Sequence, residues 1–422
     1  MTERLLQFIW QFQYFNKGEL TTLQGERLLI TSPGQYNTNQ GPDFLEAKIR
    51  IGNTTWAGNV ELHFKTSDWE KHKHHQDDNY NNVILHVVWE HDLPPQNSIP
   101  VLELKDRVPK ILLSRYRELM SSKAFIPCEK SICTVNELTW SSWKERLLAE
   151  RLTSKSESVK NSLKQNNYYW EETCWRLLAR NFGIRVNAEA FESMAKTIPL
   201  HLIGRLRNEL YKLEALLLGQ AGLLEGKFKD GYPNLLQKEH MYQKKTFQLE
   251  MVYETPVFLR MRPKSFPTLR LSQLAVLLRR SNHLFSIIRE ENSLKAVKGL
   301  FSVSASEYWN THYRFDEVSS HSHKKTGAAL VDSIVINTIA PLLFFYGVFN
   351  EDAVYKDKAI HWLQETQAEQ NSITDGFREL GIFIENASDS QALIELKTQY
   401  CDHKRCLECA VGNFLLRRTG QL

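Results

Sequence analysis

The residues best suited to chemistry lie in GPDFLEAKIRIGNTTWAGNVELHF, residues 41–64. Two runs of alternating apolar and polar residues flank Gly52-Asn53, which is typical of a two-residue hairpin turn. The first run opens with Asp43, and the second carries Glu61 and His63. A hairpin brings such carboxylates together, and one or two carboxylates are enough to hold Mg²⁺. Because a bound metal lowers the pKa of an attacking water, the stretch predicts metal-dependent phosphodiester hydrolysis.

The pairing register of this hairpin decides which side chains share a face. A strict two-residue turn pairs Asp43 with Leu62, because side chains alternate along a strand. The polar residues on one face would then be Glu46, Lys48, Glu61 and His63. A bulge at Ala57-Gly58, where glycine favours one, would instead align Asp43 with His63. Either register predicts a polar cluster on an otherwise apolar hairpin.

Pro42-Asp43, followed after seventeen residues by Glu61-Leu62-His63, resembles the PD-(D/E)XK nuclease motif. The resemblance implies an α-β-β-β-α-β core in which Asp43 and Glu61 bind Mg²⁺ or Mn²⁺. In that superfamily a lysine two residues after the glutamate positions or activates water, and here His63 replaces it. An imidazole can accept a proton from water or bind a metal, and Lys48 is a candidate for the missing positive charge. The structural alternative makes Asp43 a turn residue and puts Glu61 and His63 on a solvated strand face.

The hairpin is surrounded by loops that are dense in polar residues, and such loops often carry function. The stretch HKHHQDD, residues 72–78, is a candidate transition-metal site, because imidazole binds Zn²⁺, Mn²⁺ and Fe²⁺. A solvated surface position is the alternative for each of these histidines. The secondary site candidates are Asn39, Asp68, His72, His74 and Asp78.

A cysteine cluster lies near the end of the sequence, where Cys401, Cys406 and Cys409 follow the spacing C-x4-C-x2-C. Thiolates at this spacing converge on one soft metal ion. Zinc and an iron–sulfur cluster both fit, and buried thiols without a metal are the alternative. The candidate fourth ligands are His403, Cys128, Cys133 and Cys174.

Residues 255–280 contain no acidic residue and many basic ones. Such a stretch suits contacts to nucleic-acid phosphates, whether of DNA or RNA. The alternative is that its arginines pair with carboxylates elsewhere in the fold. The candidate nucleic-acid-binding residues are Arg260, Arg262, Lys264 and Arg270.

The elements that must position these residues form two regions. Residues 1–125 read as an amphipathic helix followed by strands near residues 26–34, 44–51, 54–64, 83–92 and 100–106, with a polar helix before the fourth. This predicts an α/β nuclease-like domain with the order α-β-β-β-α-β. A linker or seam follows at 126–139, and helical periodicity predicts a mostly α-helical domain at 140–422 that includes the cysteine cluster.

Composition sets the broad class. A chain of 422 residues predicts two or three domains, and its net charge of +4 neither demands nor excludes a polyanionic partner. The longest apolar run, residues 333–349, contains Asn337 and Pro341 and is shorter than the roughly 20 residues of a membrane span. We therefore expect a buried helix, no membrane partner and, with no export signal and reduced cysteines, a cytoplasmic location.

The chain also resembles an uncharacterised bacterial family known only as a domain of unknown function. The features that carry this resemblance over most of the chain are GPDF, GNVELH, SDWEKH, ILHVVW and the terminal cysteine spacing. It implies no established activity. The leading hypothesis is therefore a metal-dependent nuclease. Two alternatives stay open: a non-catalytic nucleic-acid-binding or scaffold protein with a degenerate nuclease core, and a histidine-rich metalloenzyme acting on a small substrate.

Overall fold

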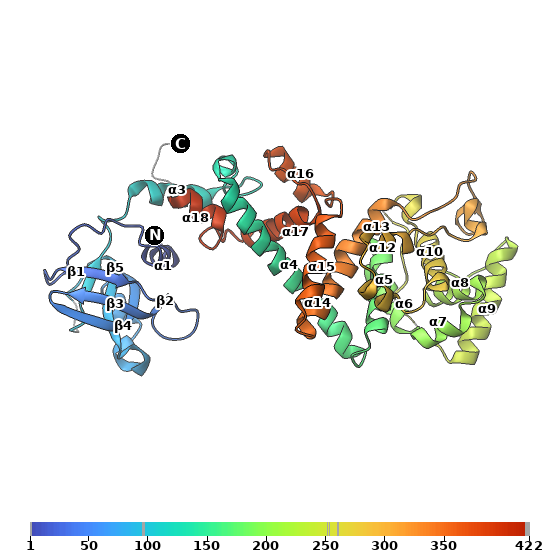
Figure 1. Ribbon diagram of the computed structural model, residues 1–422, viewed down its shortest axis with the longest axis horizontal. Helices are drawn as coiled ribbons and strands as arrows, with labels where there is room; N and C mark the ends of the chain where they lie inside the picture. The colour runs from blue at the N-terminus through green and yellow to red at the C-terminus, as the bar shows by residue number, and fades with distance from the viewer. Residues whose placement is uncertain (1, 95–97, 251, 253, 260, 418–422) are drawn as a thin grey trace. The chain divides into compact units, whose positions relative to one another are not determined.

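The chain divides into two compact units in the computed structural model, which describes residues 2–94, 98–250, 252, 254–259 and 261–417 (Figure 1). Unit 1 comprises the described residues of 1–143 and 396–422, and unit 2 comprises those of 144–395. An N-terminal α/β region followed by a mostly helical region is thus confirmed. The division differs from the expected one at its end, because the cysteine-bearing segment belongs to unit 1 and not to the helical domain.

Unit 1 is built on a six-stranded mixed sheet with the strand order β1-β3-β4-β5-β6, in which β2 pairs with β3. Strand β3 is antiparallel to β1 and β4, whereas β4, β5 and β6 are parallel. Its elements are α1 (Glu3–Gln11), β1 (Leu28–Ser32), β2 (Gln35–Tyr36), β3 (Phe44–Ile51), β4 (Thr54–Lys65), α2 (Asp68–Lys71), β5 (Val83–Glu90), β6 (Val101–Glu103), α3 (Lys110–Ser121) and α18 (Ala410–Arg417), with 3₁₀ turns at His74–Gln76, Asp78–Tyr80 and Ile132–Thr134 and a π turn at Leu396–Cys401.

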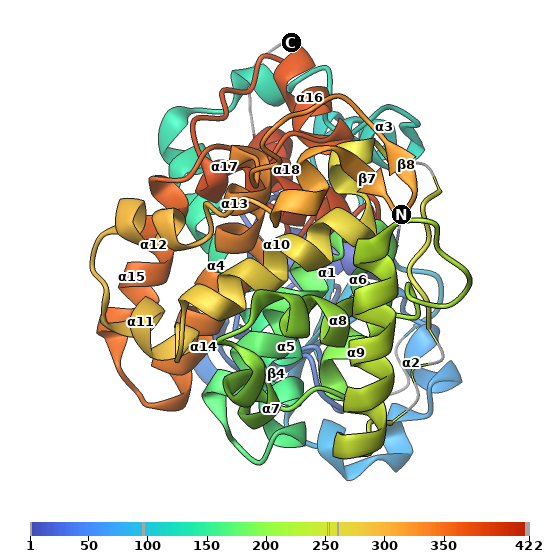
Figure 2. The same ribbon diagram turned by 90° about the vertical axis from the view of Figure 1, so that its right-hand side faces the viewer.

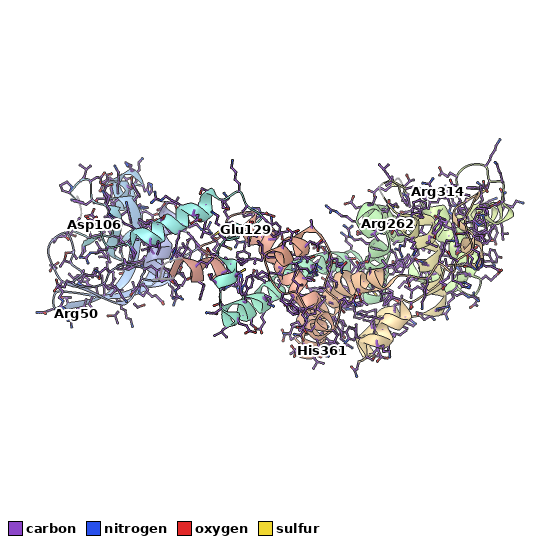
Figure 3. The ribbon with its side chains drawn as sticks, turned by 90° about the horizontal axis from the view of Figure 1, so that it is seen from above. Arg50, Asp106, Glu129, Arg262, Arg314 and His361 are labelled. Carbon is purple, nitrogen blue, oxygen red and sulfur yellow. The ribbon has the colours of Figure 1, made fainter. Side chains whose placement is uncertain are left out.

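Alternation along the hairpin strands separates a core face from a polar face. In β3, Ala47, Ile49 and Ile51 are buried, whereas Arg50, labelled in Figure 3, is exposed. In β4 the core face carries Val60 and Leu62, which pack in one apolar cluster with the buried side of α1. Glu61 and His63 therefore lie on the opposite face of β4, where α2 contacts the same strand.

The hairpin confirms the expected turn and corrects the expected bulge. Ile51 pairs with Thr54 across Gly52-Asn53, but the register shifts between Phe44 and Ala47 of β3 rather than at Ala57-Gly58. Glu46, with φ of 56°, occupies the left-handed region within the shift. Gly58 instead allows β5 to approach, because an added Cβ would lie 2.5 Å from Ile84 Cγ2. The shift places Asp43 beside Glu61, not beside His63.

The described part of unit 2 is mostly helical and contains one two-stranded sheet, β7-β8. Helix α10 packs against α8 and α5, and Figure 2 shows it crossing them. The helix α4 (Glu137–Gln165) leads into the unit. The remaining elements are α5 (Trp170–Phe182), α6 (Ile184–Lys196), α7 (Leu200–Leu206), α8 (Leu210–Gln220), α9 (Gly231–Phe247), α10 (Pro267–Arg280), α11 (Leu284–Glu290), α12 (Leu294–Leu300), β7 (His312–Arg314), β8 (Glu317–Val318), α13 (Ala328–Ile334), α14 (Ala340–Phe349), α15 (Ala353–Gln364), α16 (Ser372–Glu379) and α17 (Ala387–Glu395), with 3₁₀ turns at Pro263–Ser265 and Glu307–Asn310 and a π turn at Val335–Ile339.

The long apolar run forms one helical segment, Ala328–Phe349. Among the described residues it is the one helix long and apolar enough to cross a membrane, judged by length and composition alone, and most of it is buried within unit 2. Ile334, Leu342 and Leu343 are fully buried. The expected buried helix is therefore confirmed.

Candidate metal centre

Two carboxylates meet at the edge of the hairpin, as expected. The backbone N–H of Asp43, just before β3, donates to Glu61 Oε2 at 3.0 Å, and the N–H of Leu62 donates to Asp43 Oδ2 at 3.0 Å. From α1, Gln7 Nε2 donates to Asp43 Oδ1 at 2.7 Å. These bonds fix the orientation of Asp43, so that its side chain and backbone hold Glu61 in place.

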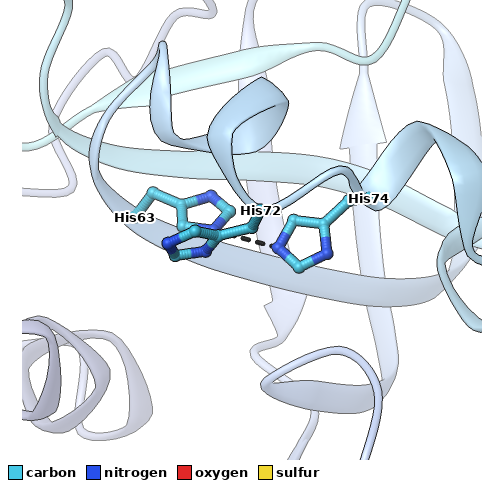
Figure 4. Close-up of side chains that lie close together, drawn as sticks. All are labelled: His63, His72 and His74. Carbon is cyan, nitrogen blue, oxygen red and sulfur yellow. Dashed lines mark hydrogen bonds between the residues drawn. The ribbon is translucent and has the colours of Figure 1, made fainter.

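Three imidazoles converge next to Glu61 (Figure 4). His63 Nε2 on β4 lies 3.1 Å from His72 Nδ1 and 3.2 Å from His74 Nε2. His72 directly follows α2, and His74 opens the next 3₁₀ turn. Between them Lys73 adopts a left-handed conformation, with φ of 58°, which reverses the chain so that both rings reach His63.

A fourth donor atom lies beside these rings. Glu61 Oε1 is 3.5 Å from Nε2 of both His63 and His74. On its other side the His63 ring is held by His86 of β5, since Nδ1 of His63 lies 2.9 Å from Nε2 of His86. His86 is thus a buried, hydrogen-bonded core histidine, and its partner is the central imidazole of the cluster.

Hydrogen bonding alone does not satisfy this arrangement. A ring nitrogen of a neutral imidazole offers either one N–H or one lone pair, yet His63 Nε2 faces two other ring nitrogens. The spacing matches a shared metal instead. An ion that binds nitrogen at about 2.0–2.1 Å holds neighbouring ligand nitrogens about 2.8–3.4 Å apart, for angles from octahedral to tetrahedral.

Burial sets the protonation of the cluster. It raises the pKa of Asp43 to about 7, and burial together with the nearby Asp43 charge raises the pKa of Glu61 to about 9. Burial, and then neighbouring imidazoles, lower the pKa of His63 well below its ordinary value. Burial also lowers the pKa of His74 and of His86 to about 4. Burial therefore favours the neutral form of His63, His74 and His86, which is the form that binds metals, and a bound cation would favour the ionised carboxylates.

Aromatic side chains enclose the imidazoles. The buried Trp69 ring contacts His63, His74 and His86 at centroid distances of 6.3, 5.3 and 5.2 Å. Tyr80 stacks on His74 at 3.9 Å. The indole N–H of Trp69 is buried and has no hydrogen-bond partner among the described residues. These two aromatic rings therefore cover one side of the imidazoles.

The other predicted hairpin and loop residues do not join the cluster. Lys48 is exposed on β3 opposite Ala57, farther along the hairpin, so it does not supply the missing charge. Asn39, Asp68 and Asp78 bond within their own loops. The backbone N–H of Asn39 donates to Asn37 Oδ1, Asp68 accepts from the N–H of Lys65 and from Lys71 Nζ, and Asp78 accepts from Asn81 Nδ2.

Sequence reasoning missed Gln7 and Trp69 as site residues. Gln7 lies on a helix far from the motif in sequence, and no local pattern marks it. Trp69 is buried and lies within the polar stretch SDWEKH. The only sequence signal was that it is the single aromatic residue of that stretch.

The basic stretch provides fewer exposed cations than expected. Arg262, labelled in Figure 3, and Lys264 are exposed around the turn Pro263–Ser265, and Arg260 lies outside the described residues. Arg270 is buried, donates to Gln273 Oε1 at 3.0 Å, and has its pKa lowered to about 10 by burial. The prediction of a phosphate contact at Arg270 is therefore wrong, because α10 is a core helix.

The chain was compared with known proteins in three ways. No curated protein matches it, and no solved structure matches it. A sequence model of one protein family matches residues 3–372, which include the whole metal-centre cluster and end before Cys401. The chain belongs to this family, described as "Protein of unknown function (DUF2851)".

Proposed function

We propose that the protein is a metal-dependent hydrolase of nucleic-acid phosphodiesters whose metal is held by His63, His72 and His74 together with Glu61. The observation that carries this proposal is the convergence of three ring nitrogens, at 3.1 and 3.2 Å, next to a carboxylate oxygen. His72 is exposed, yet its ring turns to the buried His63, as a metal ligand would.

The donor set favours a transition metal over Mg²⁺. Three imidazoles suit Zn²⁺, Mn²⁺ or Fe²⁺, whereas Mg²⁺ prefers oxygen ligands and retains water. Of the two ions expected at the Asp43 and Glu61 carboxylates, Mn²⁺ is therefore favoured. Asp43 supports Glu61 through its backbone N–H rather than through a carboxylate aimed at the imidazoles.

The chain's own residues have distinct roles in this proposal. His63, His72 and His74 bind as neutral ligands, and His86 orients the His63 ring through its second nitrogen. Glu61 supplies negative charge and, beside the ligand set, can accept a proton from an attacking water. A bound metal would polarise a phosphoryl oxygen and lower the pKa of that water.

Two features support nucleic acid as the substrate class. When the two-residue strand β2 is set aside, the chain order α1, β1, β3, β4, α2, β5 resembles the α-β-β-β-α-β order of PD-(D/E)XK nucleases, with Asp43 before β3 and Glu61 on β4. The exposed Arg262 and Lys264 are available to contact phosphates. A cytoplasmic location belongs to the same proposal.

A second candidate is a metalloenzyme that acts on a small substrate. It is favoured by the replacement of the usual lysine by His63, whose ring is buried among other imidazoles and carries no permanent charge. The third possibility, a non-catalytic scaffold with a degenerate nuclease core, would not require a metal at the histidine cluster.

The deciding experiment is a cleavage assay with the 422-residue chain. Chelator-treated protein is supplied with Mn²⁺, Zn²⁺, Fe²⁺ or Mg²⁺ and given labelled single- and double-stranded DNA, RNA and a small chromogenic phosphodiester. We expect cleavage of nucleic acid with a transition metal. The rate should fall at least about a hundredfold in Glu61→Gln and His74→Gln, because the metal contributes several kcal/mol to the transition state.

Glu46→Gln is the matched control, since Glu46 is an exposed glutamate of the same hairpin. Cleavage of the small diester alone would assign the second candidate function. Failure to cleave any of these substrates with any of the four ions would refute hydrolysis and assign the scaffold.

A further inference from the structure

Four cysteines of unit 1 lie near one another: Cys128, Cys401, Cys406 and Cys409. In the sequence, all of unit 2 separates Cys128 from the other three. Cys401 ends the π turn Leu396–Cys401, and Cys406 and Cys409 follow before α18. Cys406 belongs to the apolar core of unit 1, and Cys128 packs against that core. Burial raises the pKa of the Cys401 thiol, and the neighbouring thiols of Cys409, Cys128 and Cys406 raise it further, so all four interact.

The local backbone is shaped to bring the thiols together. The loop from Cys401 to Cys409 turns back at Lys404, whose φ of 51° is left-handed, and Lys404 Nζ donates to the carbonyl of Met120 at the end of α3. Gly412 allows α18 to lie against the loop, because an added Cβ would come within 2.1 Å of the Cys406 carbonyl oxygen. A side chain at Gly412 would force the cysteine loop outward.

Cys409 is provided with hydrogen-bond donors that suit a thiolate. It directly precedes α18, and although burial raises the pKa of its thiol, the backbone N–H groups of Val411 and Gly412 act to lower that pKa. Donors of this kind and the positive end of a helix stabilise a negatively charged sulfur. The position therefore suits a thiolate bound to a metal.

The separation of the sulfur atoms indicates the kind of centre. A single tetrahedral zinc, with bonds of about 2.3 Å, holds its sulfurs about 3.8 Å apart. Among the described residues, the three histidines form a group whose ligand atoms all lie within 4.8 Å of one another, whereas the cysteine sulfurs form no such group of three. In an iron–sulfur cluster the thiolates bind different irons, so their sulfurs stand farther apart than those around one ion.

We propose that Cys128, Cys401, Cys406 and Cys409 are the thiolate ligands of an iron–sulfur cluster. Cys128 completes the C-x4-C-x2-C set, which alone offers three ligands where such clusters take four. The other two candidate cysteines are excluded by position: Cys133 is exposed, and Cys174 is buried in α5 of unit 2. His403 is exposed and is not required. The cluster would join the 128 segment to the 401–409 loop.

The test is to purify the chain without oxygen and to measure iron, acid-labile sulfide, zinc and the visible absorption spectrum. We expect two or four irons per chain with matching sulfide. Cys128→Ser should lose most of the iron and sulfide, whereas Cys133→Ser, a nearby exposed cysteine, should retain both. Circular dichroism of each variant shows whether a loss of iron follows from loss of fold.

Zinc without sulfide, protein without metal, or equal iron loss in Cys133→Ser would each overturn the proposal. The wild-type iron and sulfide content decides the matter even if Cys128→Ser does not fold. Because this centre uses none of the histidine ligands, Glu61→Gln should leave its iron and spectrum unchanged, so the result is independent of the proposed hydrolase activity.

Discussion

Metal binding at the histidine cluster should release about one proton per chain at pH 8. With the pKa of Glu61 raised to about 9, roughly nine-tenths of its carboxyls are protonated at that pH. Asp43, with a pKa of about 7, contributes at most roughly a tenth of a proton. His63, His74 and His86 contribute none, because burial lowers the pKa of each of them. A carboxylate beside the metal must be ionised, so the Glu61 proton is expelled.

Titration calorimetry measures this number directly. Mn²⁺ is added to chelator-treated protein at pH 8 in several buffers that differ in ionisation enthalpy, and the slope of observed heat against that enthalpy is the number of protons released. Mn²⁺ is chosen because thiolates, which favour softer metals, compete poorly for it. Glu61→Gln should reduce the release to roughly a tenth of a proton and weaken binding, because the neutral amide has nothing to ionise.

Glu46→Gln is again the control and should release the same proton as the wild type. Tight Mn²⁺ binding with no proton release by the wild type would refute a protonated Glu61. Unchanged release in Glu61→Gln would show that the proton comes from another group.

Three further outcomes are expected. In metal-free protein the Glu61 carboxyl has a folded pKa above its ordinary 4.5, so the unfolded state loses this proton first. The free energy of unfolding should therefore fall by up to roughly 1.4 kcal/mol per pH unit between pH 7 and 9, above the range in which histidines titrate, as urea denaturation with and without Mn²⁺ would show. His74→Ala should weaken Mn²⁺ binding more than about tenfold by calorimetry, whereas His75→Ala, at an exposed neighbour, should not. For nucleic acid, Arg262→Glu with Lys264→Glu should flatten the slope of log affinity against log salt by about 0.7–0.9 for each lost contact, and an unchanged slope would remove these residues from the interface.

The sequence was sufficient to predict the hairpin and the meeting of Asp43 with Glu61, because a two-residue turn fixes pairing locally. It was not sufficient to place the bulge. Gly58 suggested one by its lack of a side chain, but that space is used by Ile84 of the neighbouring parallel strand. A glycine in a strand can mark either a bulge or the close approach of a neighbouring strand. The local sequence does not decide between them, because the neighbouring strand comes from another part of the chain.

The remaining differences also come from tertiary contacts. The convergence of His72 and His74 depends on the left-handed conformation of Lys73. Residues other than glycine rarely adopt this conformation, so a lysine in the sequence does not predict it. Charge patterning marked Arg270 as a surface cation, whereas α10 is buried from Pro267 to Leu278. Periodicity likewise assigned the cysteine segment to the helical region, since a pattern within one segment does not show which distant core it joins.

The discontinuity of unit 1 has a consequence for its synthesis. Residues 396–417 contribute Cys406 and Leu416 to the unit 1 core, yet the ribosome makes them only after all of unit 2. Unit 2 is continuous in the sequence and can fold as soon as it leaves the ribosome. Unit 1 cannot complete its core until residues 396–417 have been made, so its folding is finished after that of unit 2, the reverse of the usual N-terminal-first order. A chain truncated before residue 396 would therefore carry the histidine cluster on a unit 1 that lacks Cys406 and Leu416 from its core. The apolar surface left exposed would be bound by chaperones and cleaved by proteases.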